Sequence, residues 1–426
     1  IFYAVKLASR EFVPRQEDRR IVTWTNFPQV FSYCIPYFFM AYLVRRRDTR
    51  LLRILLLPLV VAMAVRCTWG YTFANPRLRW YEWDRGIIAL VCIAKAIDFA
   101  WAKNGRHKMT EQSLKVVNDQ QGPIRSNNAN RTGLLAHFPD GLCDALEVGL
   151  SMRGIGWDFG QYIYVPPPTQ PLSRRPFVVH ALKNLVHNVL AIDLIDTIIK
   201  LTPGVGPTSG TIFLAHLSPF PRYALSTVLH LGFGLLIHCG VCVVYDSFAL
   251  LAVLGIGQSP AGWPPITGGL WHVTSLHAFW SRAWHQALRH VFLVYGGFPG
   301  RAVAGRAGAT VGTFLASGLV HELGITAAGV GFDARVLVFF LLQAVGVVLE
   351  KTLREVMGRR VGGFFGFMWA ALFVVGFGQM CTDAWFSRGI GGATTIPTQL
   401  SPIRRLVLPS SRWLVYVALK GAECSK

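Results

Sequence analysis

Long apolar blocks are the feature that most constrains what this chain can fold into. A helix that crosses a bilayer needs about 20 mostly apolar residues. Eight blocks are of that order, and a ninth is shorter: Phe27–Val44, Leu51–Tyr71, Gly86–Ala102, Phe177–Leu201, Tyr223–Ile256, Ala307–Val330, Val336–Leu353, Val361–Trp385 and Leu406–Leu419. The blocks predict an all-α, polytopic integral membrane protein with about eight or nine transmembrane helices, plus interfacial helices.

Composition agrees with this class. Only 15% of the residues are charged and 52% are hydrophobic, whereas soluble domains carry roughly 25% charged residues. We treat residues 1–426 as one membrane-embedded domain. The chain begins at Ile1 rather than Met, so we expect that further N-terminal sequence could precede it.

The net charge of +20 is concentrated in alternate loops. These are 45–50, 103–176, 282–306 and 351–360, while the intervening loops are nearly uncharged. Basic loops stay in the cytosol, so we interpret the charge as a topology signal and not as a nucleic-acid-binding surface. We expect a multi-pass protein of the endoplasmic reticulum with cytosolic basic loops.

Two smaller features belong to the same membrane pattern. Within the loop 103–176, the stretch from Asp140 to Met152 has an acidic first turn and precedes Gly154, which predicts an interfacial helix. Trp69, Trp83 and Trp385 lie near the ends of apolar blocks, as in an aromatic belt.

His321 stands close to the middle of the sixth block, in SGLVHE. An imidazole at this depth must face protein or a water-filled cavity, because lipid cannot satisfy its ring nitrogens. Ser317 lies one helical turn before it on the same face, and Glu322 follows it. A catalytic histidine and a structural histidine bonded to a neighbouring helix both remain possible from this segment alone.

A second polar constellation lies in residues 263–292. From about Ser275 the spacing predicts a helix with Trp280, Trp284 and Leu288 on one face and Arg282, His285 and Arg289 on another. One interpretation is an interfacial helix whose Trp and Arg residues meet lipid headgroups. The other is a cationic lining for a phosphorylated cosubstrate, with His285 aimed at the reacting centre.

Four motifs in this order resemble one family. RGIGW (153–157), WPP (263–265), FWSRAWHQALR (279–289) and SGLVHE (317–322) are similar to the wax-synthase-like branch of the membrane-bound O-acyltransferases. The likeness is greatest to fungal members that acetylate terpenoid or meroterpenoid hydroxyls. The catalytic motif region is 263–324. Ala283 departs from the pattern, since a second Arg or similar residue is expected there.

The resemblance implies a reaction. An acetyl or other acyl group would pass directly from acetyl-CoA or acyl-CoA to a hydroxyl of an apolar alcohol that enters from the lipid bilayer. His321 would be the general base and His285 would orient the acyl carbonyl or the acceptor. The cosubstrate would be bound by Arg282, Arg289 and Trp284. The resemblance implies neither a permanently bound cofactor nor a metal. Ser317 would fix the tautomer of His321, and Trp280 would lie near the site. Glu322 could have either a structural or a functional role.

Several alternatives stay open. A wax synthase would join long-chain acyl-CoA to a fatty alcohol. A magnesium-dependent prenyltransferase needs two Asp-rich motifs, and Asp193–Asp196 supplies one. A membrane transporter would show inverted repeats, and we find none. We interpret Cys239 and Cys242, which follow His238, as small buried residues rather than a redox or metal site. The polar face of 180–196 could line the reaction chamber or pack against other helices.

Overall fold

The computed structural model describes residues 10, 12–111, 138–161, 163–270 and 273–409. Within these ranges the regular secondary structure is helical apart from two short strands, β1 (Arg20–Ile21) and β2 (Tyr71–Thr72), which pair in parallel. The principal helices are α2 (Phe27–Val30), α3 (Cys34–Val44), α4 (Arg50–Trp69), α5 (Arg79–Trp101), α7 (Asp140–Leu150), α8 (Arg174–Leu201), α9 (Pro219–Leu250), α10 (Leu276–Ala278), α11 (Arg289–Phe292), α12 (Phe298–Thr326), α13 (Ala334–Met357), α14 (Gly363–Ala371) and α15 (Gly378–Ser387).

The prediction of an all-α polytopic membrane protein is confirmed. Six helical stretches in the described part of the chain are long and apolar enough to cross a bilayer: Arg50–Trp69, Arg174–Leu201, Pro219–Gly255, Arg289–Thr326, Ala334–Met357 and Gly363–Ser387. The remaining predicted spans differ. Phe27–Val44 is divided into α2 and the short α3, and most of Leu406–Leu419 lies outside the described residues.

Helix α5 replaces the predicted span Gly86–Ala102 and is not among the six. It begins seven residues earlier, in a segment rich in charged residues, and it buries Lys95 and Asp98. The Lys95 ammonium donates to the carbonyl of Ser151, and the Asp98 carboxylate pairs with Arg106. A helix with these charges is satisfied by protein contacts rather than by lipid.

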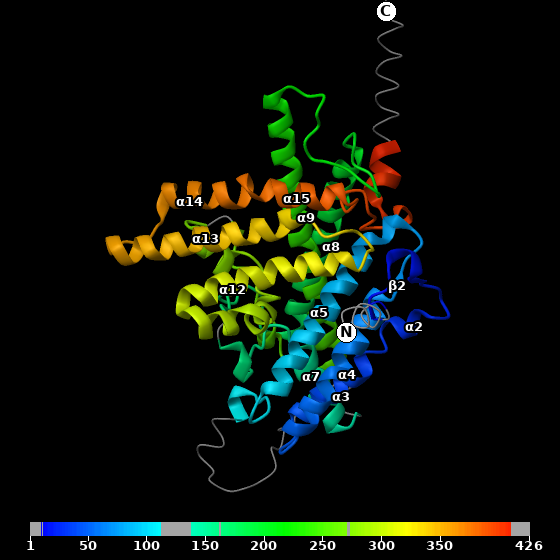
Figure 1. Cartoon of the computed structure of the whole chain (residues 1–426), viewed down its shortest axis with the longest axis vertical. Coiled ribbons are helices and arrows are strands. Elements are labelled where there is room, and N and C mark those ends of the chain that lie inside the picture. The colour runs from blue at the N-terminus through cyan, green and yellow to red at the C-terminus, as the bar shows by residue number, and fades with distance from the viewer. Residues whose placement is uncertain (1–9, 11, 112–137, 162, 271–272, 410–426) are drawn as a thin grey trace, which may run out of the picture.

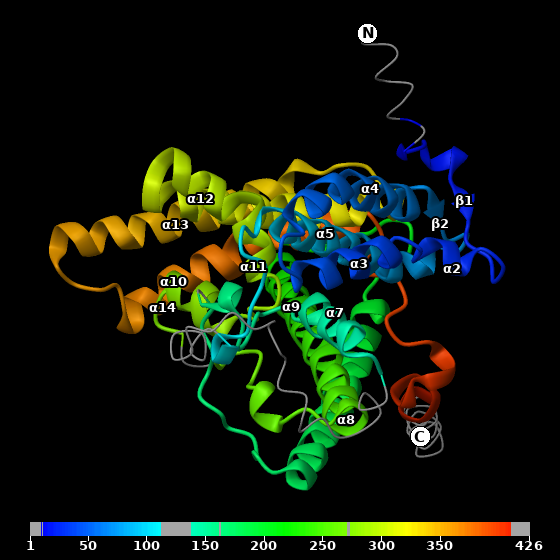
Figure 2. The same cartoon turned by 90° about the horizontal axis from the view of Figure 1, so that it is seen from below.

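The helices form two packed groups that meet around α12 and α15 (Figures 1 and 2). In the first, α4 packs against α3 and α5, and α7 covers α3. In the second, α8 and α9 lie side by side, and α9 reaches α15. Helix α12 joins the groups because it packs on α5 and on α13, which in turn contacts α15.

The predicted aromatic belt is wrong for three tryptophans. Trp69, Trp83 and Trp385 are only 7%, 5% and 7% exposed. The Trp83 indole N–H donates to the backbone carbonyl of His321 at 3.2 Å, and its ring lies 5.0 Å from that of Trp385. These side chains pack in the interior, because the helices that carry them meet there.

A reversal at Gly305 places part of the chain beside α12. Ala304 and Gly305 leave helical geometry, and Gly305 has φ of +58°, which favours glycine. The segment 289–303 therefore runs back against 306–326. Gly296 and Gly300 allow close approach, since a Cβ atom on them would lie 1.9 Å from the Gly312 carbonyl oxygen and 2.2 Å from that of Gly308.

Candidate active site

A cavity of about 1020 Å³ connects the two polar constellations found in the sequence. His285 and His321 both line it, together with Trp280, Trp284 and Ser317. Arg289 also lines it, while Glu322 and Arg282 do not. The structure thus brings together most of the side chains that the sequence selects, although they come from separate segments.

His321 presents one ring nitrogen to this cavity. Its Nδ1 lies 2.7 Å from the backbone carbonyl oxygen of Ser317. A carbonyl oxygen only accepts hydrogen bonds, so Nδ1 carries the proton and Nε2 keeps its lone pair. Ser317 therefore fixes the tautomer through its backbone, whereas its hydroxyl has no such role here. This geometry suits His321 to accept a proton.

Aromatic rings surround the His321 imidazole. Phe340 stacks on it with ring centroids 5.0 Å apart, Phe292 lies at 6.0 Å and Trp385 at 6.4 Å. Phe340 and Trp385 also line the cavity. Aromatic walls exclude water, which strengthens electrostatic interactions in the site.

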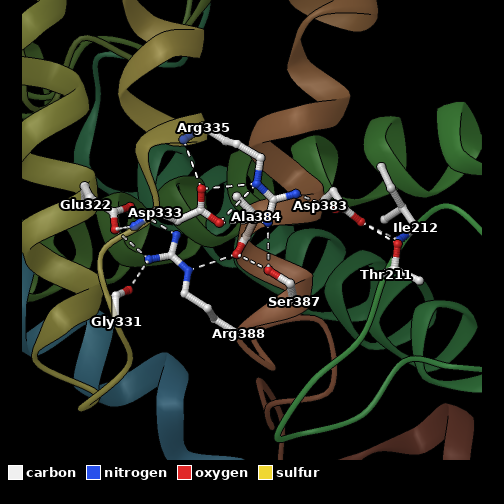
Figure 3. A network of polar contacts seen from close by, with 10 residues as sticks. All are labelled: Thr211, Ile212, Glu322, Gly331, Asp333, Arg335, Asp383, Ala384, Ser387 and Arg388. Atoms are coloured by element: carbon white, nitrogen blue, oxygen red, sulfur yellow. Dashed lines mark hydrogen bonds and ion pairs between the residues drawn. The ribbon is translucent and has the colours of Figure 1, made fainter.

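Glu322 points the other way, into an ion-pair network that is drawn in Figure 3. Its carboxylate is fully buried and accepts from both terminal nitrogens of Arg388, at 2.7 and 3.0 Å, and from the backbone N–H of Asp333. Arg335 continues the network to Asp333 and Asp383. Glu322 thus fastens the end of α12 to α15, a structural role.

The continuous helix predicted from Ser275 is wrong. Helix α10 and a π-turn at 279–283 form, Trp284 adopts an extended conformation, and helical structure resumes only in α11. The carbonyls that the break exposes find other donors: the Gln286 amide donates to Trp280 and Trp284, and the Gly268 N–H donates to Arg282. The break removes the predicted two-faced helix and turns His285 into the cavity.

His285 is enclosed by protein. Burial, reinforced by the neighbouring imidazoles of His321 and His238, lowers its pKa to about 3. A neutral imidazole offers one N–H donor and one acceptor. Among the described residues, nothing hydrogen-bonds its buried Nδ1. His285 can therefore direct a neutral hydrogen bond at a group inside the cavity.

Cationic side chains gather where α12 begins and α13 ends. Arg301, Arg306, Lys351 and Arg354 line the cavity, and the Lys351 ammonium donates to the Thr310 hydroxyl at 2.8 Å. At a rise of 1.5 Å per residue, Arg306 lies about 20 Å along the helix from His321. One end of the cavity is thus cationic and the other carries the histidines.

Arg282 and the two upstream motifs lie elsewhere. The Arg282 guanidinium stacks over the ring of Tyr164, 5.5 Å from its centroid. Arg153 of RGIGW is buried and donates to the carbonyl of Pro264 in WPP at 3.1 Å, an oxygen that also accepts from the Tyr245 hydroxyl. These two motifs thus contact each other, and none of these three residues lines the cavity.

The polar residues of α8 are also outside the cavity lining. Asn184 bonds to the His180 ring and Asn188 to the Asn184 carbonyl. Asp196 pairs with Lys200 and Arg404, while Asp193 accepts from the Ser401 hydroxyl and the Ile403 N–H. The Asp-rich motif is thus engaged in packing the segment after α15 against α8.

Some cavity residues escaped the sequence analysis. Phe340, Trp385 and Lys351 lie on helices whose apolar or basic patterns give no sign of a site, whereas His277 lies within the motif region but is not singled out there. In the sequence, Lys351 begins a basic loop and Trp385 ends an apolar block. Only the regular spacing of α13, which sets Phe340 and Lys351 near one face, could have indicated them.

Comparisons with known proteins agree with the motifs. Residues 263–342 match the family described as membrane bound O-acyl transferase. The chain is 24% identical to acetyltransferase ple2 of Rhodocybe pseudopiperita, over 55% of this chain and 61% of that protein. It is 27% identical to acetyltransferase aurG of Calcarisporium arbuscula, over 46% and 52% of the two chains. With acetyltransferase eriL of Hericium erinaceus it shares 26% identity, over 51% and 60%.

The chain thus spans about half to three fifths of the length of these curated relatives. No solved structure matches it. The matched segment 263–342 contains the FWSRAWH motif, His285 and His321. The resemblance seen in the motifs is therefore confirmed: residues 263–342 are similar to the membrane bound O-acyl transferase family, and about half of the chain is similar to fungal acetyltransferases.

Proposed function

We propose that this protein is an O-acyltransferase that moves an acetyl group from acetyl-CoA to a hydroxyl of an apolar, terpenoid-like alcohol. The observation that carries the proposal is one cavity that holds two histidines at one end and a cluster of cations at the other. The similarity to proteins named acetyltransferases supports the choice of acyl group.

His321 acts as the general base in this proposal. Its free Nε2 takes the proton from the acceptor hydroxyl as the oxygen attacks the thioester carbonyl carbon. The tetrahedral intermediate then expels the thiolate of coenzyme A, and the imidazolium returns the proton to that sulfur. The carbon–oxygen bond thus forms in the first step and the carbon–sulfur bond breaks in the second, and no acyl-enzyme is needed.

His285 supplies the hydrogen bond to the developing oxyanion. Its pKa of about 3 keeps the ring neutral at physiological pH. One N–H therefore remains to donate to the thioester carbonyl oxygen, and such donors contribute strongly in an enclosed site. Trp280 and Trp284 line the same cavity, and the Trp284 ring lies 5.1 Å from that of His285.

Acetyl-CoA enters from the basic side, which we assign to the cytosol on an endoplasmic reticulum membrane. Arg289, Arg301, Arg306 and Lys351 face the path that its phosphates would take. Phe340 and Trp385 stand beside His321, where the acyl chain would extend. This crowding favours a short acyl group over the long chain that a wax synthase uses.

A donor and acceptor panel tests the function. Membranes containing the protein should convert labelled acetyl-CoA and a terpenoid alcohol to an ester, and they should use palmitoyl-CoA with a fatty alcohol much less. The activity should persist in EDTA, because direct transfer requires no metal. A preference for palmitoyl-CoA would support the wax synthase, and magnesium-dependent prenyl transfer would overturn acyl transfer.

Neutralising the cationic end should weaken donor binding. We expect Arg306→Gln and Lys351→Gln each to raise the KM for acetyl-CoA roughly 3- to 10-fold, with little change in kcat, because each removes about 1 kcal/mol of attraction. The effect should shrink at high salt. Arg359→Gln, just beyond α13 and outside the cavity lining, is the matched control.

Arg282→Gln gives a further arm of the same measurement. The resemblance assigns Arg282 to the cosubstrate, whereas its guanidinium lies over Tyr164. A KM equal to that of the control would remove Arg282 from the donor site. Unchanged KM values in the Arg306 and Lys351 variants would contradict donor entry at this end.

A further inference from the structure

A third histidine lies close to the pair in the cavity. His238 is on α9, and its ring packs 6.3 Å from that of Trp284, whose ring lies 5.1 Å from His285. His238 does not line the cavity itself. It therefore stands behind the Trp284 wall, on the side that α9 covers.

Helix α9 also packs against a second aromatic residue that lines the cavity, Trp385. Phe233, five residues before His238, packs against Trp385 at 5.8 Å, and Trp385 flanks His321. Helix α9 thus runs past both catalytic-site histidines, on the far side of the aromatic residues Trp284 and Trp385. A substrate that approaches along α9 would reach them from outside the donor cavity.

The side chain of His238 is not satisfied by the protein. Its Nδ1 is buried and has no hydrogen-bond partner among the described residues. Its Nε2 has only the Cys242 sulfur at 3.9 Å, a weak partner. A polar group left in this state within a spanning helix is costly, and a ligand hydroxyl would relieve that cost.

Room for such a ligand exists one turn away. Gly234 lies on the same face of α9 as His238, and a Cβ atom placed on it would meet nothing within 4 Å. By contrast, His230, one turn further, is held by the Thr382 hydroxyl and the Val374 carbonyl. His238, which lacks a good hydrogen-bond partner, therefore lies one helical turn from the unfilled space at Gly234.

We propose that His238 binds the hydroxyl of the acceptor alcohol, with the apolar body of the acceptor lying against Gly234 on α9. This inference rests on the proposed acyl transfer and adds the acceptor's binding residue to it. The acceptor and the donor would then approach the histidine pair from opposite sides of the Trp284 wall. Displacement of the Trp284 ring would then let this hydroxyl enter the cavity, where His321 takes its proton.

Separate KM values for the two substrates test this assignment. His238→Leu should raise the KM for the acceptor at least tenfold, while the KM for acetyl-CoA stays within twofold. His238→Gln should recover part of the loss, because its amide can still bond a hydroxyl. Cys242→Ala removes the weak sulfur partner of His238 and should behave as the wild type.

A second pair of variants tests the space rather than the hydrogen bond. Gly234→Leu should exclude a bulky terpenoid alcohol yet accept a small one such as hexanol. Gly240→Leu makes the same change at another open position on α9, on a different face, and should not alter this preference. Both variants should insert normally, since neither added side chain meets protein at its Cβ.

The outcomes separate the two proposals. If the wild type transfers no acyl group to any alcohol, the proposed function fails and this inference falls with it. If the wild type is active but His238→Leu leaves the acceptor KM unchanged, or raises both KM values equally, only the role of His238 is overturned. An unaltered acceptor preference in Gly234→Leu would contradict the acceptor path along α9.

Discussion

Replacing His321 with alanine should lower acetyl transfer by about 10²- to 10⁴-fold, the usual contribution of a general base. The reason lies in the bond between Nδ1 and the Ser317 carbonyl, which leaves Nε2 as the only ring nitrogen able to take a proton. Initial rates at saturating donor and acceptor, normalised to the amount of inserted protein, measure the effect.

Two controls make the His321 result specific. His321→Gln keeps a polar side chain of similar size without a base and should be as inactive as the alanine variant. His180→Ala removes a histidine on α8 outside the cavity lining and should retain activity. Near-normal turnover of His321→Ala would remove this residue from the mechanism.

Replacing His285 with alanine should reduce kcat by about 10²- to 10³-fold, the cost of one lost oxyanion donor. Because the ring is neutral, with a pKa of about 3, it acts as a hydrogen-bond donor rather than as a charge. His285→Asn should therefore recover part of the rate through its amide N–H, whereas an aliphatic residue should not.

Which kinetic parameter changes in these variants is as informative as the size of the change. A donor that acts in the transition state lowers kcat and kcat/KM together, so the KM for acetyl-CoA should change little in His285→Ala. More than half of the wild-type rate in His285→Ala would exclude it from the site. Equal rates for the alanine and asparagine variants would exclude the hydrogen-bonding role.

Features set by local pattern could be predicted from the sequence. The apolar blocks around α4, α8 and α13 have the length that a spanning helix requires, and the helices form close to those bounds. His321 was identifiable because a polar ring inside an apolar block has few uses. The motifs that resemble the family selected His285 for the same region.

Features set by distant contacts could not be predicted. The break at Trp284 depends on Gln286 and on the Gly268 N–H, which take up the carbonyls that a helix would use. The ion-pair partner of Glu322 is Arg388, which comes 66 residues later in the sequence, after α13 and α15. Trp385 has the position of an interfacial residue in the sequence but packs beside His321 because α15 folds inward.

The most direct test of the account is ester formation from labelled acetyl-CoA in membranes that contain the wild type or His321→Ala at matched levels, with the same terpenoid alcohol. We predict labelled ester from the wild type and at least a hundredfold less from the variant. Equal amounts of ester from both, or none from the wild type with any alcohol in the panel, would contradict it.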